Sequence, residues 1–101
     1  MSRVNEYLRA IADAERNGTY HSMQANTHLD ISHSYAKHGD DAKAAQYLAM
    51  SGEHREKSAG LYRQAAEFRD KLANLYRLQE EAAKKPAPEP TFWQKLMGMA
   101  A

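Results

Sequence analysis

Histidine is the residue type best suited to chemistry in this 101-residue chain. Five histidines are present, and four of them lie between positions 21 and 38. On a helix, His21 and His28 share one face, because seven residues bring the chain round almost two full turns. His33 and His38 point in two other directions. The spacing therefore predicts one histidine pair on a helix face.

A metal site around Asp30 and His33 is a more specific hypothesis for the function of these histidines. These residues form an i, i+3 pair, which Glu53 or His54 of a facing helix would complete. A carboxylate-bridged metal pair on helices is built from Glu-x-x-His, and this chain contains no such motif. Cysteine is also absent, which excludes thiolate ligands. We expect no metal ligand; a helical metal-binding cargo with a C-terminal packaging tag is kept as an alternative.

The remaining catalytic residue types lack the context that their chemistry needs. The serines at positions 22, 32, 34, 51 and 58 fall in helical sequence without a strand–elbow motif. The five glycines never cluster, so no phosphate-binding loop is predicted. We therefore expect no enzymatic activity, no catalytic residue and no cofactor.

The charge balance disfavours nucleic acid as the main partner. Lys plus Arg number 14 and Asp plus Glu number 13, whereas a phosphate-binding protein needs a strongly basic face. The basic residues of the segment 63–77 alternate with Glu67 and Asp70, as on a solvated helix. A nucleic-acid-associated regulatory accessory protein that uses this Arg-rich helix remains the second alternative.

The C-terminal segment has the pattern of a docking peptide. Residues 86–90, PAPEP, predict an extended, stiff linker of roughly 3 Å per residue. Residues 91–101, TFWQKLMGMAA, are too few to hold a helix alone in water, so they need a surface on which to order. The candidate partner-binding residues form one stripe on a short helix: Phe92, Trp93, Leu96, Met97 and Ala100.

Helices account for the rest of the chain. Residues 3–16 predict an amphipathic helix capped by Ser2 and either broken or bent at Asn17-Gly18. Residues 20–38 predict a second helix that Gly39 closes. Asp40 or Asp41 begins a third helix, and the polar stretch 51–58 either continues it or interrupts it.

The clearest periodicity begins after this polar stretch. Its positions are spaced by alternating steps of four and three: Leu61, Ala65, Phe68, Leu72, Leu75, Gln79 and Ala82. This heptad pattern predicts either packing of a long helix on its own domain or a homo-oligomer through Leu61, Ala65, Phe68, Leu72 and Leu75. Tyr47, Tyr62 and Tyr76 on the same helix are candidates for a second interaction face.

The middle of the chain resembles the helix–turn–helix of a tetratricopeptide-type repeat. The residues that carry the resemblance are Ile31, Ser32, Tyr35, Gly39-Asp40, Ala44, Leu48 and Ser51. The closing proline of that repeat is missing and no second copy follows. The resemblance therefore implies a helical hairpin with a Gly-Asp turn.

These observations predict an all-α protein: an antiparallel helical hairpin or small two-to-three-helix bundle with one long heptad-bearing helix. The expected domains are a helical body over 1–85, a Pro-rich linker over 86–90 and an amphipathic docking peptide over 91–101. No segment is apolar enough to span a membrane, and we expect a cytoplasmic location. The expected function is non-enzymatic: an adaptor or accessory protein whose C-terminal peptide docks in a partner's hydrophobic groove.

Overall fold

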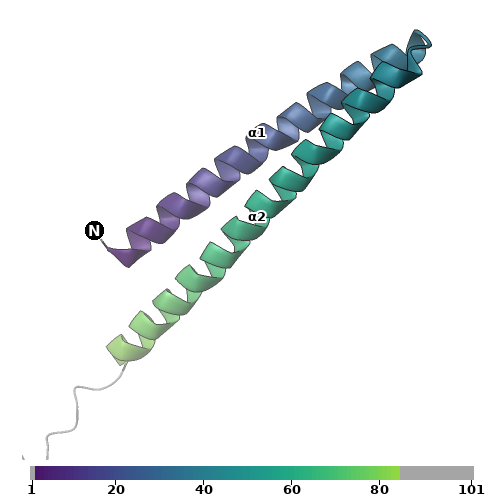
Figure 1. Ribbon diagram of the computed structural model, residues 1–101. Helices are drawn as coiled ribbons and strands as arrows, with labels where there is room; N and C mark the ends of the chain where they lie inside the picture. Colours follow the sequence, from purple (N-terminus) through teal and green to yellow (C-terminus); the bar gives the residue numbers. More distant parts are fainter. Residues whose placement is uncertain (1, 85–101) are drawn as a thin grey trace, which may run out of the picture.

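A computed structural model describes residues 2–84 as two long helices joined by a tight turn (Figure 1). Helix α1 spans Arg3–Lys37, 35 residues, and α2 spans Asp41–Lys84, 44 residues. The helices run antiparallel along each other, and the described residues contain no strand. At 1.5 Å per residue, α2 is about 66 Å long. The prediction of an all-α antiparallel hairpin is confirmed; residues 86–101 lie outside the described range.

The helix ends follow the capping residues. The backbone N–H of Asn5 donates to the Ser2 hydroxyl at 3.2 Å, as predicted for the start of α1. Gly39 has φ +79°, the left-handed conformation that favours glycine after a helix. The Asp40 carboxylate accepts from the backbone N–H of Lys43 at 3.1 Å and so begins α2. The predicted Gly-Asp turn is therefore present.

The predicted break at Asn17-Gly18 is wrong, because α1 runs through both residues. Gly18 is buried against the ring of Tyr62 from α2. A Cβ at position 18 would lie 3.2 Å from two atoms of that ring. Glycine at this position allows close approach of the two helices and does not end a helix.

The stretch 51–58 is continuous helix. Although it reads as a polar surface, Ser51 and Ser58 are buried between the helices. Glu53 and the residues around it at 55–57 face solvent. The polar stretch therefore belongs to the interface on one side and to the surface on the other.

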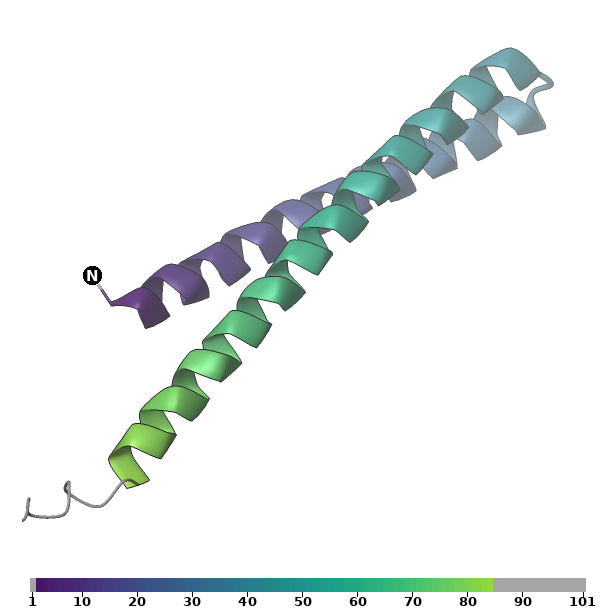
Figure 2. The ribbon, with the colours of Figure 1, turned by 60° about the horizontal axis from the view of Figure 1, so that its bottom comes forward.

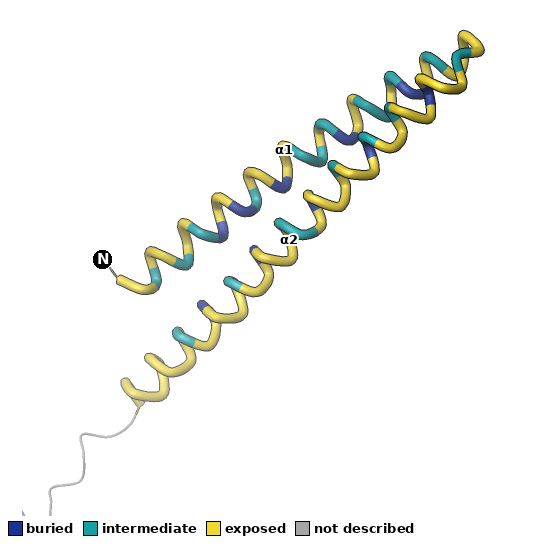
Figure 3. Tube along the Cα trace, in the orientation of Figure 1, coloured by how far each residue is buried: buried dark blue, intermediate teal, exposed yellow. Residues whose placement is uncertain are grey.

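The contact between the helices has a strict seven-residue repeat, which we call the seam. In α1 the seam residues are Ile11, Gly18, Ala25 and Ser32. In α2 they are Ala44, Ser51, Ser58, Ala65 and Leu72. Figure 3 shows these buried positions recurring along the facing sides of both helices. Because the helices are antiparallel, a step of seven along α1 matches a step of seven back along α2.

A second row of larger, half-buried side chains follows the seam residues by three positions. In α1 these are Tyr7, His21, His28 and Tyr35, and in α2 they are Tyr47, His54, Leu61, Phe68 and Leu75. The predicted heptad from Leu61 to Leu75 thus packs on α1 of the same chain. A homo-oligomer through those five residues would have to replace α1, since Ala65 and Leu72 are already buried.

Candidate functional site

Three serine hydroxyls cross the seam to backbone carbonyls of the other helix. Ser32 donates to the carbonyl of Ala44 at 2.6 Å, near the turn. From α2, Ser51 donates to the carbonyl of Ala25 at 2.8 Å, and Ser58 donates to that of Gly18 at 2.8 Å. One such bond therefore occurs in each of three successive heptads.

These bonds explain why serine is tolerated at buried positions. A buried hydroxyl without a partner is destabilising, and in a helix it usually turns back to its own backbone. Here the facing residues, Ala44, Ala25 and Gly18, have little or no side chain, so each hydroxyl reaches the opposite main chain. Over these three heptads the seam is therefore held by close approach and hydrogen bonding, with little burial of large apolar groups.

Three histidines form a cluster beside the seam, at mid-length of the hairpin. We call His21 and His28 of α1 together with His54 of α2 the histidine cluster. Nδ1 of His21 lies 2.8 Å from Nδ1 of His54, so one nitrogen donates to the other. The ring of His54 lies 5.1 Å from that of His21 and 5.1 Å from that of His28, measured between centroids. The predicted pairing of His21 and His28 on one face is present, with His54 between them.

The cluster disfavours positive charge on its central member. Burial, and after it the charges of His21, His28 and Lys57, lower the pKa of His54 below its ordinary value of 6.5. Glu53 acts in the opposite direction, as the smallest of these causes. The ring of His54 therefore favours the neutral form in the folded chain.

The ring of His54 stacks on that of His21 with an interplanar angle of 29° and is tilted by 39° against that of His28. Within residues 2–84, no three histidine, aspartate or glutamate side chains are placed to hold a metal ion. The geometry therefore suits packing and proton exchange between the rings.

Aromatic side chains extend the cluster toward the turn. His28 lies 5.9 Å from the ring of Tyr47, and Tyr47 stacks on Tyr35 at 5.6 Å with an interplanar angle of 18°. Lys43 lies over the ring of Tyr35, 5.3 Å from its centroid. Between the histidine cluster and the turn, one flank of the hairpin thus carries a row of neighbouring rings.

The three tyrosines predicted as one interaction face are divided between two flanks. Tyr47 packs among the rings beside the seam. Tyr62 covers Gly18 on the other flank and shares a hydrogen bond of 2.9 Å with the hydroxyl of Thr19. Tyr76, two heptads after Tyr62, is 48 % exposed near the open end. Tyr62 and Tyr76 thus share a heptad position on α2 that Tyr47 does not occupy.

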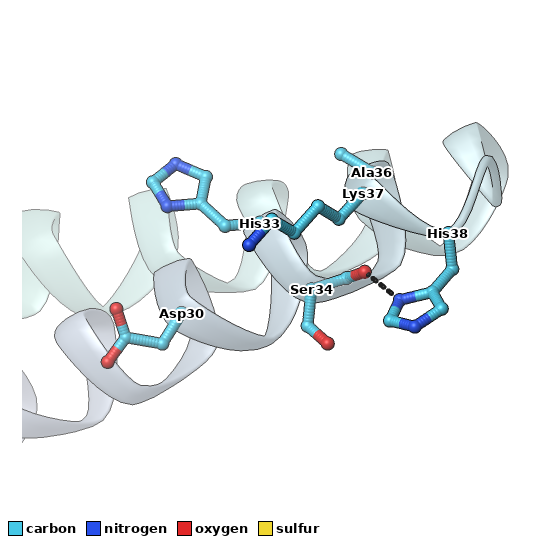
Figure 4. A pocket seen from close by; sticks show the side chains of 6 residues that line it. All are labelled: Asp30, His33, Ser34, Ala36, Lys37 and His38. Atoms are coloured by element: carbon cyan, nitrogen blue, oxygen red, sulfur yellow. Dashed lines mark hydrogen bonds between the residues drawn. The ribbon is translucent and has the colours of Figure 1, made fainter.

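Asp30 and His33 do not meet the histidine cluster, so the metal site considered around them with Glu53 or His54 is not formed within residues 2–84. Both line an open groove of about 690 Å³ on α1 next to the turn, together with Ser34, Ala36, Lys37 and His38. Figure 4 shows their side chains projecting separately from the helix, while Nδ1 of His38 lies 2.7 Å from the carbonyl of Ser34. One helix and the turn supply the whole lining, so this groove is a surface feature.

A smaller groove of about 190 Å³ lies at the open end of the hairpin. Its lining comes from both helices: Arg3, Tyr7, Lys71, Asn74, Leu75 and Leu78. Leu78 is 56 % exposed, and α2 continues past the start of α1 here (Figure 1). This end combines apolar and basic side chains.

The residues predicted to bind a partner, Phe92, Trp93, Leu96, Met97 and Ala100, lie outside the described residues. None of the described helices is apolar enough over sufficient length to cross a bilayer. The chain matches no protein-family model, no curated protein and no solved structure. The fold that residues 2–84 define is a long antiparallel hairpin with a small-residue seam.

Proposed function

We propose that this protein is a non-enzymatic adaptor or accessory protein. Its hairpin acts as a stiff body, and residues 91–101 act as a tethered peptide that docks in the hydrophobic groove of a partner. We place it in the cytoplasm, and its lack of cysteine fits a reducing compartment.

The seam is the observation that supports this proposal best. Its serine hydroxyls and small side chains are all used to hold α1 against α2. The histidine cluster likewise joins the two helices. The grooves described above, near the turn and at the open end, are exterior surfaces of the hairpin, whereas small-molecule sites are usually concave and enclosed. Such a body is suited to spacing and presentation.

The chemistry of the C-terminal segment supplies the second support. Burial of Phe92, Trp93 and Leu96 in a groove would contribute roughly 1.5–3 kcal/mol for each side chain. Ordering and association oppose this by several kcal/mol, so one copy would bind with an affinity of about micromolar class. The linker at 86–90 separates this peptide from the hairpin, as reaching a partner requires.

Comparison of the full chain with a chain that ends at Lys85 tests the proposal. We expect the melting temperature and the mass in solution to stay unchanged. A lower melting temperature or a changed mass would assign residues 86–101 to the fold or to an oligomer, and the proposal would fail.

Trp93 provides an independent signal, because it is the only tryptophan of the chain. In the isolated protein its fluorescence should be quenched by acrylamide as strongly as that of a free indole, and a partner should protect it. Crosslinking to the partner should be lost when Phe92, Trp93 and Leu96 are replaced by Ala. The matched control replaces Gln94 and Lys95, which are not members of the predicted apolar stripe.

A further inference from the structure

The histidine cluster lies where a change of charge would act on both helices. His21 follows the seam residue Gly18 by three positions, and His54 follows Ser51 by three. The hydrogen bonds from Ser51 and Ser58 therefore lie on either side of the contact between His21 and His54. A force that separates the two rings acts directly on these bonds.

The contact between His21 and His54 depends on protonation. At 2.8 Å, one Nδ1 carries a proton and donates it, and the other Nδ1 must keep a free lone pair to accept it. When both rings become imidazolium ions, both nitrogens carry protons and the acceptor is lost. The same contact then becomes a repulsion between two positive charges.

The surroundings offer little compensation for added charge. Nδ1 of His28 is buried and has no hydrogen-bond partner among the described residues. Lys57 contributes a further positive charge, and Glu53 is the one carboxylate that influences His54. A protonated cluster would thus place several like charges within stacked rings.

We infer that the histidine cluster is an acid-sensitive clasp: its neutral rings join α1 to α2 at mid-length, and their protonation separates the helices there. The clasp is independent of the docking peptide and would operate in a chain without residues 86–101. The turn at Gly39 and the apolar contacts at the open end keep the two helices connected while the middle opens.

The direction of the pH effect follows from the lowered pKa of His54. In the unfolded chain His54 binds its proton near pH 6.5, whereas the folded chain resists that proton. The unfolded state therefore gains protons first as the pH falls. The stabilisation is complete above about pH 6.5 and is lost as the pH falls through that value toward the lower pKa of the folded state.

Thermal unfolding of the full chain at about pH 7.5 and about pH 5.5 tests the clasp. This window lies above the range in which ordinary carboxylates take up protons. The wild-type melting temperature should fall across the window, and His54→Gln should remove a large part of that fall. His33→Gln is the matched control, since His33 is exposed on α1 outside the cluster, and it should behave as wild type.

An NMR titration of the wild-type histidine rings tests the same inference without a substitution. The midpoint of His54 in the folded chain should lie below its midpoint in denaturant. The inference is overturned if the wild-type melting temperature is equal at both pH values, or if His54→Gln keeps the full acid effect. Should His54→Gln not fold, the NMR midpoint decides: a value at or above that of the unfolded chain rejects the clasp.

Discussion

The half of the hairpin near the turn and the half near its open end are held together by different interactions. In the turn half, the seam consists of small side chains and of serine hydroxyls bonded to opposite carbonyls. In the open half, all the buried residues are apolar, and two of them, Ile11 and Leu72, are large. They cluster with Ala14 and Ala65, and Val4, Tyr7 and Phe68 pack against them. Figures 1 and 2 show the helices close together near the turn and diverging toward the start of α1.

Side-chain size explains this divergence. Glycine, alanine and serine allow two helix backbones to approach closely, so a hydroxyl can reach the opposite main chain. Isoleucine, leucine and phenylalanine keep the axes farther apart and stabilise by burial of apolar surface. The same seven-residue repeat therefore produces a closely packed half and a spaced half. The two halves should respond in opposite ways to changes of residue size.

Enlargement of the seam in the turn half should have the largest effect. Ser51 is 2 % exposed, and Ser51→Leu adds two heavy atoms between backbones that have no room for them. We expect a loss of about 3 kcal/mol in the free energy of unfolding, measured by urea denaturation. Ser51→Ala adds no bulk and removes the hydroxyl with its hydrogen bond, so it should lose only about 1 kcal/mol.

The control for this change is Ala66→Leu, on the exposed side of α2. It adds the same kind of side chain where nothing opposes it, so stability should stay within about 0.5 kcal/mol of wild type. Equal losses for Ser51→Leu and Ala66→Leu would contradict the closely packed seam.

Reduction of residue size should be most damaging in the open half. Leu72 is the largest buried aliphatic side chain of α2, at 8 % exposure. Leu72→Ala removes apolar burial from the cluster with Ile11, and we expect a loss of about 2 kcal/mol in the free energy of unfolding. This value is near the lower limit for such substitutions, because the open end of the hairpin can relax around the smaller side chain. Hydrogen exchange should accelerate in the open half, while amides around Ser32 and Ala44 keep their protection. Uniform acceleration along both helices would show that the halves are not separable.

The sequence was sufficient to predict the helical class, the turn and one part of the interface. Gly39 and Asp40 indicated the turn, because glycine is preferred directly after a helix and aspartate directly before one. The apolar heptad from Leu61 to Leu75 indicated the face that packs in the open half, because large side chains produce a strong periodic signal.

The turn half was not predicted, because its buried residues are not hydrophobic. Ser51 and Ser58 read as part of a polar surface, and Gly18 read as a helix break. The signal that could have identified them is the exact repeat of small residues every seven positions. The position of His54 between His21 and His28 also required the register between the helices, which the length of the turn determines.

The smallest predicted effect concerns Gly18, where two opposing contributions nearly cancel. Gly18→Ala favours the helix by about 1 kcal/mol, since alanine is the better helix former. The new methyl group meets the Tyr62 ring at 3.2 Å, and this ring must move although its hydroxyl is bonded to Thr19. Tyr62 is 42 % exposed and has room to yield, so the net change in the free energy of unfolding should lie within about 0.5 kcal/mol of zero.

In a Tyr62→Ala background the ring that opposes the new methyl group is absent, and Gly18→Ala should then stabilise by close to the full 1 kcal/mol. A double-mutant cycle over these two positions measures how tightly the helices approach at Gly18. An equal effect of Gly18→Ala in both backgrounds would mean that the approach of the helices does not require glycine there.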